Sequence, residues 1–239
     1  MVPRDMARPG RALQAVGLGT LVAFAPLPTS HAQSPPNKSE IREYKGLFAS
    51  TIKGELDETQ RLLAGGADPN VIDDQGRTPL HIAMHRRERE IALALVKAGA
   101  NPRAADRSGY DILGIAVVRD DADLVNFAIG LGADPKAETG RYGGTVLNAA
   151  AQLGHEAVVA TLIKAGSPLD HVNKAGWSAL IEAIVLGEGT PRHLACVQAL
   201  LAAGANPNLA DRNGNSPLTL ARKKGFAAIA AAIEKAGGK

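Results

Sequence analysis

The stretch that decides the fold is Thr78-Pro79-Leu80-His81-Ile82-Ala83, followed by Ala98-Gly99-Ala100-Asn101-Pro102. A threonine before a proline predicts a helix start, because the hydroxyl caps free backbone N–H groups and proline is tolerated in a first turn. The leucine and the alanine of this motif stand three residues apart and share one helix face. Apolar residues between Ile91 and Val96 predict a second helix, and Gly99 predicts its end, where a left-handed backbone is needed. The stretch therefore predicts two short helices joined by a turn.

The same pattern is repeated along most of the chain. The units are recognised by the glycines that end them, which are Gly66, Gly99, Gly132, Gly166 and Gly204. The first two intervals are 33 residues long, the third is one residue longer, and the fourth is five residues longer than the first. One such helix pair cannot bury its own apolar faces, so neighbouring units must stack on one another.

The pattern resembles the ankyrin repeat, which residues 78–106 match without a gap. This resemblance implies an all-α fold, an ankyrin-repeat solenoid of about six helix-turn-helix units with hairpin-like loops. We place the repeat domain at residues 41–239, with units at about 41–73, 74–106, 107–140, 141–173, 174–211 and 212–237. The first and last units depart from the pattern, as terminal capping repeats should.

A segment typical of a secretory signal precedes the repeats at residues 1–32. Arg4, Arg8 and Arg11 are followed by an apolar run of about 14 residues, and Ser30-His31-Ala32 offers small residues at the two positions that a signal peptidase reads. A membrane anchor is disfavoured, because a helix needs ~20 apolar residues to span a bilayer. We expect cleavage after Ala32, a periplasmic or secreted protein, no stable membrane insertion, and a disordered linker at residues 33–40.

The composition and net charge of the chain disfavour two classes of function, catalysis and nucleic-acid binding. Aromatic residues make up only 3% of the chain, which suits a thin core of small helices better than a globular enzyme. The net charge of +3 falls to +1 without residues 1–32, so overall basicity does not indicate nucleic-acid binding. No phosphate-binding loop, carboxylate pair at catalytic spacing or nucleophile motif is present, so we expect no enzyme activity and no cofactor.

Three sets of residues are of types that can bind metals or react, but each also has a possible structural role. His81 and His85 stand four residues apart, a spacing that can hold a metal, but the family uses the His81 position for structural hydrogen bonds and no third ligand is placed by the repeat. The acidic cluster Asp120, Asp121 and Asp123 lacks the spacing of a calcium loop and suits a solvated turn that favours the next helix N-terminus. Cys196 is expected on a buried stripe as a small hydrophobe. We therefore predict no metal site.

The resemblance also implies where a partner binds. Ankyrin proteins usually meet partners through the hairpin tips and the concave side of each first helix. Of the 25 such positions in this chain, nine are Arg or Lys and one is acidic, whereas the remaining surface must be about −7. These nine basic residues, together with aromatic residues that can serve as anchors, predict a basic concave face. The predicted partner-binding residues are Arg77, His85, Arg86, Arg107, Tyr110, Arg119, Arg141, Tyr142, Lys174, Trp177, Arg212 and Lys223.

These patterns favour an exported, monomeric interaction module that binds a protein with an acidic patch and does not bind nucleic acid. Two alternatives remain open: an immunity protein that neutralises a secreted toxin, and a binder of a polyanion or envelope glycan. An effector acting in a host cell would need a second secretion step. The five extra residues within 187–193 are compatible with either a partner-specific loop or a neutral change in length.

Overall fold

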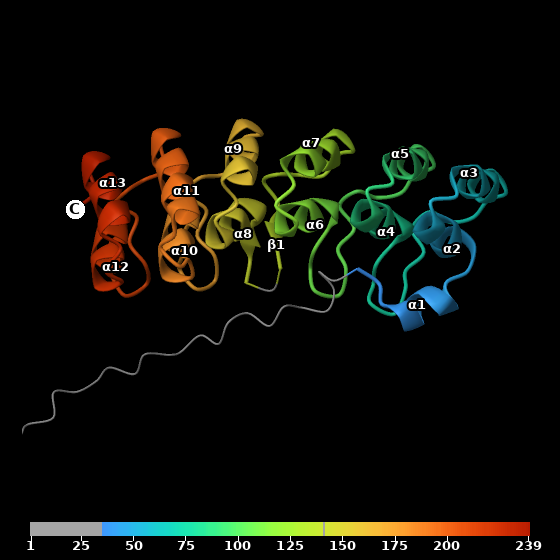
Figure 1. Ribbon diagram of the computed structural model, residues 1–239, viewed down its shortest axis with the longest axis horizontal. Helices are drawn as coiled ribbons and strands as arrows, with labels where there is room; N and C mark the ends of the chain where they lie inside the picture. Colours follow the sequence, from blue (N-terminus) through green and yellow to red (C-terminus); the bar gives the residue numbers. More distant parts are fainter. Residues whose placement is uncertain (1–34, 141) are drawn as a thin grey trace, which may run out of the picture.

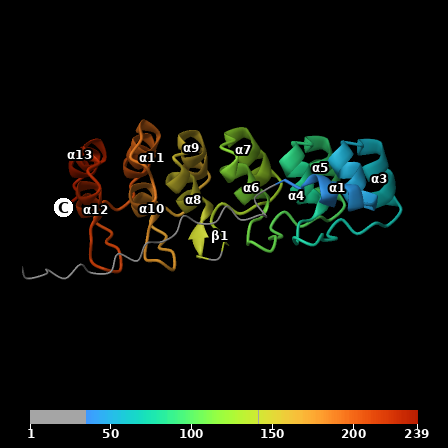
Figure 2. The ribbon, with the colours of Figure 1, turned by 60° about the horizontal axis from the view of Figure 1, so that its bottom comes forward.

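The structure, a computed structural model, describes residues 35–140 and 142–239. The expected export signal at residues 1–32 lies outside these residues. Six helix pairs follow one another, and a short helix, α1 (Lys38–Glu43), precedes them. In Figure 1 the first helices of the pairs form one row, the second helices form another, and the loops between pairs project beyond the first row. Figure 2 shows the same two rows from another side. The predicted ankyrin solenoid of six units is confirmed.

The helices have the lengths that the repeat predicts. The first helices are α2 (Gly46–Lys53), α4 (Pro79–Arg86), α6 (Ile112–Val118), α8 (Val146–Leu153), α10 (Ala179–Val185) and α12 (Pro217–Lys223). The second helices are α3 (Leu56–Ala64), α5 (Arg89–Lys97), α7 (Ala122–Gly130), α9 (Glu156–Lys164), α11 (Pro191–Ala202) and α13 (Ala227–Lys235). Two short strands, β1 (Glu138–Thr139) and β2 (Gly144–Thr145), form an antiparallel hairpin before α8.

The helix boundaries follow from the capping residues in the sequence. Thr78 and Ser216, each followed by proline, accept N–H groups of the first turns of α4 and α12. Gly54 and Gly154 end α2 and α8 with φ of +73° and +69°, in the left-handed region that glycine enters without a Cβ clash. Each first helix is therefore short because its two ends are specified locally.

The core is a continuous layer between the two rows of helices. Leu80, Leu113, Leu147 and Leu180 occupy equivalent positions of successive first helices and are at most 1% exposed. Each first helix packs against the first helix of the next pair as well as against its own partner. Burial of one such leucine contributes about 2 kcal/mol, and only a neighbouring unit can supply it. Cys196 is fully buried in this layer, as predicted, and burial raises the pKa of its thiol to about 11.

Apart from the β1–β2 hairpin, the hairpins between units share one turn geometry. An aspartate or asparagine begins each of these turns, and its Oδ1 accepts the backbone N–H groups two and four residues further on; these residues are Asp73, Asp106, Asn173 and Asp211. The hairpins are joined to one another in the middle of the stack. The N–H of Arg107 donates to the carbonyl of Gln75 at 3.0 Å, and that of Lys174 to the carbonyl of Tyr142 at 2.9 Å. The hairpins therefore form a connected row.

The N-terminal segment differs from the sequence expectation. Residues 38–40 belong to α1 and not to a disordered linker. Asn37 Oδ1 accepts the N–H groups of Ser39 and Glu40, while the Glu40 carboxylate accepts the N–H of Asn37 at 2.7 Å. This reciprocal capping box satisfies the free N–H groups of the first turn. The spacing of Asn37 and Glu40 was a visible signal for a helix start, so the linker prediction was wrong at this end.

Candidate functional site

Most of the predicted partner-binding residues lie at the surface on the side of the first helices and hairpins. Arg86, Arg107, Arg119, Tyr142, Lys174, Arg212 and Lys223 are exposed, and Tyr110 and Trp177 are half-buried. Arg77 and His85 are buried, and Arg141 lies outside the described residues. We call the seven exposed residues, together with the exposed Lys224, the inner face.

Helix ends and hairpins position the inner-face residues. Arg86 is the last residue of α4, Arg119 follows the last residue of α6, and Lys223 ends α12. Because units stack in register, Arg86 and Arg119 occupy the same place in neighbouring units. Arg107 and Lys174 are fixed by the hairpin-to-hairpin backbone bonds. A basic side chain at a helix C-terminus also interacts favourably with the helix dipole.

The exposed arginines of the inner face make no ion pairs within the part of the chain that the structure describes. Arg86, Arg107, Arg119 and Arg212 have no ion pair within 4.0 Å among the described residues. At the turns between paired helices, arginines do pair with acids: Arg87 with Asp121, and Arg192 with Asp120. Acidic residues are therefore available in the described part of the protein but do not pair with these four arginines.

Arg77 was wrongly assigned to the binding surface, since its side chain is only 1% exposed. Its guanidinium lies 2.7 Å from Asp73 and 3.0 Å from Glu40, and Nη2 donates to the Tyr44 hydroxyl at 3.1 Å. Burial alone would raise the pKa of Asp73, but hydrogen bonds from Tyr44 and Arg77 outweigh burial and lower it. Arg77 thus fastens α1 to the first hairpin. The repeat register could not predict this role, because Glu40 and Tyr44 lie outside the repeat pattern.

His85 was also expected at the exposed surface, but the structure buries it, with only 6% exposed. Neither ring nitrogen has a hydrogen-bond partner in the structure. Burial, with His81, Arg119 and Arg77 nearby, lowers the pKa of His85 to about 4. Its ring is therefore neutral at neutral pH and lies beneath the inner face rather than on it.

His81, one turn earlier, has a structural role. Its Nε2–H donates to the carbonyl of Tyr110 at 3.2 Å, and its Nδ1 accepts from the Thr78 hydroxyl at 2.8 Å. The structural interpretation of this histidine is confirmed, and neither of its nitrogens is free for a metal. Within residues 35–140 and 142–239, no group of three or more His, Cys, Asp or Glu side chains is arranged to hold a metal ion.

Glu182 is a buried acid that the sequence analysis missed. It lies on α10, is 5% exposed, and accepts from the side-chain amides of Asn173 at 2.5 Å and Asn148 at 3.4 Å. Burial raises the pKa of Glu182 to about 7, although the two amides lower it in part. Ile82 and Ile115 occupy the same position in earlier units. The charged residue at a position that is otherwise aliphatic was the signal that could have identified it.

The aromatic residues are positioned by the hairpins. Tyr110 packs so closely on α6 that a Cβ at Gly114 would lie 2.9 Å from its ring. The carbonyl of Trp177 accepts from Asn148, which anchors the backbone of this hairpin. Tyr142 is the most exposed of the three, at 39%. Tyr142 therefore offers more of its surface to a partner than Tyr110 or Trp177 does.

The acidic cluster and the insertion both contribute to the turns between paired helices. Asp121 caps α7 by accepting the N–H of Leu124 at 3.0 Å, which confirms the predicted role at a helix N-terminus. Arg192, at the start of α11, pairs with Asp120 two units earlier. His193 donates to the carbonyl of Gln152 at 3.0 Å, the same kind of contact that His155 makes with Val117 at 2.8 Å; these bonds satisfy carbonyls at the ends of first helices.

Other residues of the insertion contact the last unit. Gly189 has φ of +64°, and a Cβ there would lie 2.5 Å from the Phe226 ring. The insertion therefore packs against the last unit as well as the earlier ones, so in this structure it is part of the stack.

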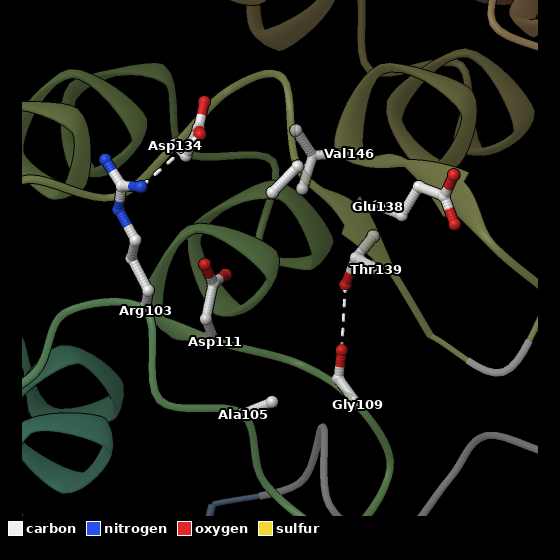
Figure 3. Close-up of a pocket in the computed structure, with 9 residues that line it drawn as sticks. Arg103, Ala105, Gly109, Asp111, Asp134, Glu138, Thr139 and Val146 are labelled. Carbon is white, nitrogen blue, oxygen red and sulfur yellow. Dashed lines mark hydrogen bonds and ion pairs between the residues drawn. The ribbon is translucent and has the colours of Figure 1, made fainter.

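The pocket in Figure 3 is too small to be a small-molecule site. It lies between the hairpins of the third and fourth units and encloses about 80 Å³, whereas ligand pockets usually measure about 300–1,000 Å³. Arg103 points toward Asp134, at 3.5 Å, and the Thr139 hydroxyl donates to the carbonyl of Gly109 at 3.0 Å. The polar groups of this pocket are largely engaged with one another.

No helix in the described part of the chain has the length and apolar character needed to cross a membrane.

Known proteins share both the sequence pattern and this fold. A family model described as "Ankyrin repeats (3 copies)" matches residues 29–106, 47–139 and 113–211. An ankyrin repeat protein of Escherichia coli K12, YahD, is 35% identical over 186 residues, which are 77% of this chain and 92% of the relative. The crystal structure of an ankyrin repeat domain from Acinetobacter baumannii AYE is 37% identical, with a TM-score of 0.74, and covers 81% of this chain and 98% of that domain.

A second similar structure includes a partner. It is the complex of Bd0816, a predatory endopeptidase of Bdellovibrio bacteriovorus, with immunity protein Bd3460. The matched chain is 26% identical to this one, with a TM-score of 0.64, over 80% of this chain and 98% of the matched chain. Ankyrin repeats are modules for protein–protein interaction, and on the extent of these matches this chain belongs to the ankyrin-repeat family.

Proposed function

We propose that this chain is an exported interaction module that binds one protein through the inner face, and that the partner presents an acidic surface there. The observation that carries the proposal is the set of exposed arginines without ion pairs, Arg86, Arg107, Arg119 and Arg212. A basic surface that the protein does not neutralise itself attracts acidic partners and increases their rate of association. The exposed ring of Tyr142 adds a rigid contact of the kind enriched at interfaces.

Affinity capture with the tagged full-length chain, from envelope extract of the source cells, tests this proposal. The test variant carries Arg86→Glu, Arg107→Glu and Arg119→Glu. The matched control carries Lys97→Glu, Lys164→Glu and Lys235→Glu, which reverse the same number of exposed charges near the ends of second helices. We expect the control to retain the captured protein and the test variant to bind it roughly tenfold more weakly or worse, since each surface ion pair contributes up to about 1 kcal/mol.

Salt provides a second measurement on the same complex. Capture should weaken markedly between about 50 and 500 mM NaCl, because exposed charges are screened over this range. Equal capture by the test and control variants, or capture that does not respond to salt, would show that the basic inner face is not the binding site. A strong salt dependence without any discrete protein in the captured material would favour a polyanion as the ligand.

Export is part of the proposal and has its own test. The order of basic residues, apolar run and Ser30-His31-Ala32 supports cleavage after Ala32. N-terminal sequencing of the protein from the periplasmic or secreted fraction should begin at Gln33. A chain that keeps Met1 and stays in the cytoplasmic fraction would contradict the assignment.

Immunity is a second candidate function, and one observation favours it. A chain from the structure of the Bdellovibrio endopeptidase in complex with immunity protein Bd3460 aligns over most of this chain. We propose, as the alternative, that this chain neutralises an exported enzyme in the same manner. The captured protein would then be a hydrolase or toxin, bound one-to-one, and the purified chain would inhibit its activity in stoichiometric amounts. A captured partner whose activity is unaffected by the chain would favour a scaffold.

A further inference from the structure

His85 has an environment that packing alone does not explain. The residue is only 6% exposed, yet both ring nitrogens lack hydrogen-bond partners. An unsatisfied buried polar group costs about 1–3 kcal/mol, and such groups are rare in native structures. The fold does not require a polar residue here, since Val118 and Val185 occupy the equivalent position in two other units. A valine would avoid the cost, so the histidine calls for another role.

The charges near His85 are predominantly positive. Arg86 follows it on α4, and Arg119 lies at the end of the neighbouring α6; both are exposed and have no ion pair among the described residues. The groups that act on the charge of His85 are His81, Arg119 and Arg77, and no acid is among them. Asp73 pairs with Arg77, and Asp106 Oδ1 accepts two hairpin N–H groups while its Oδ2 has no hydrogen-bond partner among the described residues. The result is a concentration of positive charge around an imidazole that has no hydrogen-bond partner.

Both positive and negative groups lie on the elements around His85. They are Lys53 on α2; Asp73, Asp74 and Arg77 in the preceding hairpin; His81 and Arg86 on α4; Arg87, Glu88, Arg89, Glu90 and Lys97 in the turn and on α5; and Asp106, Arg107, Asp111 and Arg119 in the third unit. Arg87 pairs with Asp121 and Lys53 approaches Glu55 at 3.8 Å, so these two cations have acids of their own. Arg86 and Arg119 remain for an external anion.

We propose that His85, with Arg86 and Arg119, forms the anchor point for a carboxylate of the partner, and that the imidazole takes up a proton when the carboxylate binds. This inference rests on the proposed function and names the group that the inner face recognises. Both nitrogens are buried in this structure, so neighbouring side chains must move before a carboxylate can reach them. Arg86 and Arg119 are long and exposed and can move with the incoming anion.

The proton uptake follows from electrostatics. In the free protein, burial and the neighbouring cations disfavour the imidazolium form and hold the pKa of His85 at about 4. A carboxylate against the ring reverses the local charge and supplies the missing hydrogen-bond acceptor, so it raises this pKa. By linkage, whatever raises the pKa on binding makes binding tighter as the pH falls. If the bound imidazole titrates two units higher, affinity should rise about fourfold between pH 7.5 and 5.5.

A hexaglutamate peptide, blocked at both ends, is the probe. NMR titration of the His85 ring in the full chain, with and without saturating peptide at constant ionic strength, should show a pKa at least one unit higher with peptide. Binding by the His85→Val variant should lose the wild-type dependence on pH between 5.5 and 7.5 and remain salt-sensitive. Valine is the residue that the chain itself uses at this position, so the variant should keep its fold. Arg119→Gln should weaken binding severalfold at every pH in this range.

The outcomes separate the two proposals. Peptide binding that depends on Arg119, but leaves the His85 pKa unchanged and the pH dependence of His85→Val equal to wild type, overturns the His85 inference and leaves the inner face intact. Absence of peptide binding also overturns it. Failure of the proposed function appears in a different experiment, as partner capture that ignores salt and the inner-face charge reversals.

Discussion

Replacing Glu182 with glutamine should stabilise the protein at pH 8 and change its stability little at pH 4. The carboxyl is 5% exposed, and no cation among the described residues pairs with it, since its two hydrogen-bond donors, Asn148 and Asn173, are neutral amides. Burial raises its pKa from 4.5 to about 7. Glutamine keeps an oxygen that can accept from both amides and has no charge at any pH in this range.

The sign and the size follow from linkage. Below pH 4.5 the carboxyl of Glu182 is protonated in both the folded and the unfolded chain. Its ionisation therefore does not lower the free energy of unfolding in this range. Between pH 4.5 and about 7 the unfolded chain loses this proton while the folded chain keeps it, and stability falls as the pH rises. Above pH 7 the loss is complete, and a pKa difference of about 2.5 units corresponds to about 3 kcal/mol. The Glu182→Gln variant should recover most of this loss in the free energy of unfolding.

Urea unfolding followed by circular dichroism at 222 nm, at pH 4, 5, 6, 7 and 8, measures the effect. The relevant quantity is the difference in unfolding free energy between variant and wild type, because every other titrating group is common to both. Glu188→Gln, at an exposed position of the insertion, is the matched control and should show no trend with pH. A difference for Glu182→Gln that is the same at pH 4 and pH 8 would refute the reasoning.

Three further predictions concern structural roles. Arg77→Leu should cost about 3–5 kcal/mol in urea unfolding, because it leaves two carboxylates at α1 and the first hairpin without their cation; a cost below 1 kcal/mol would mean that the buried cluster contributes little. The Cys196 thiol should react with a disulfide reagent at pH 8 only after unfolding, since it is buried and its pKa is about 11; rapid labelling of the folded chain would contradict its burial. Gly189→Ala should lower the melting temperature, because the φ of +64° and the contact with Phe226 both disfavour a Cβ; an unchanged melting temperature would show that the insertion does not pack on the last unit.

The repeat pattern was enough to predict the solenoid. Helix starts at Thr78 and Ser216, helix ends at Gly54 and Gly154, and buried positions such as Leu80 are all properties of short segments. Each of these properties is specified by residues a few positions apart in the sequence. Because the unit is repeated, a helix or turn recognised in one unit supports the same assignment in the other units. Stacking then follows because a single pair leaves apolar surface exposed.

The candidate site could be predicted only in part, because the exposure of some residues depends on contacts beyond their own unit. The register correctly placed Arg86, Arg107 and Arg119 at the surface, because their exposure depends on their position in the unit. It failed for Arg77 and His85, whose exposure depends on what other parts of the chain bring to them.

Local sequence is thus enough to specify the repeating unit: its helices, its caps and the number of copies that stack. The pairing of charges across units, in contrast, is established only by the folded chain. Arg77 meets Glu40 from outside the repeats, and Arg192 reaches Asp120 over an intervening unit. Such contacts join residues far apart in sequence and have no local signature, so they appear only when the chain is folded. Whether an arginine is left for a partner depends on these contacts.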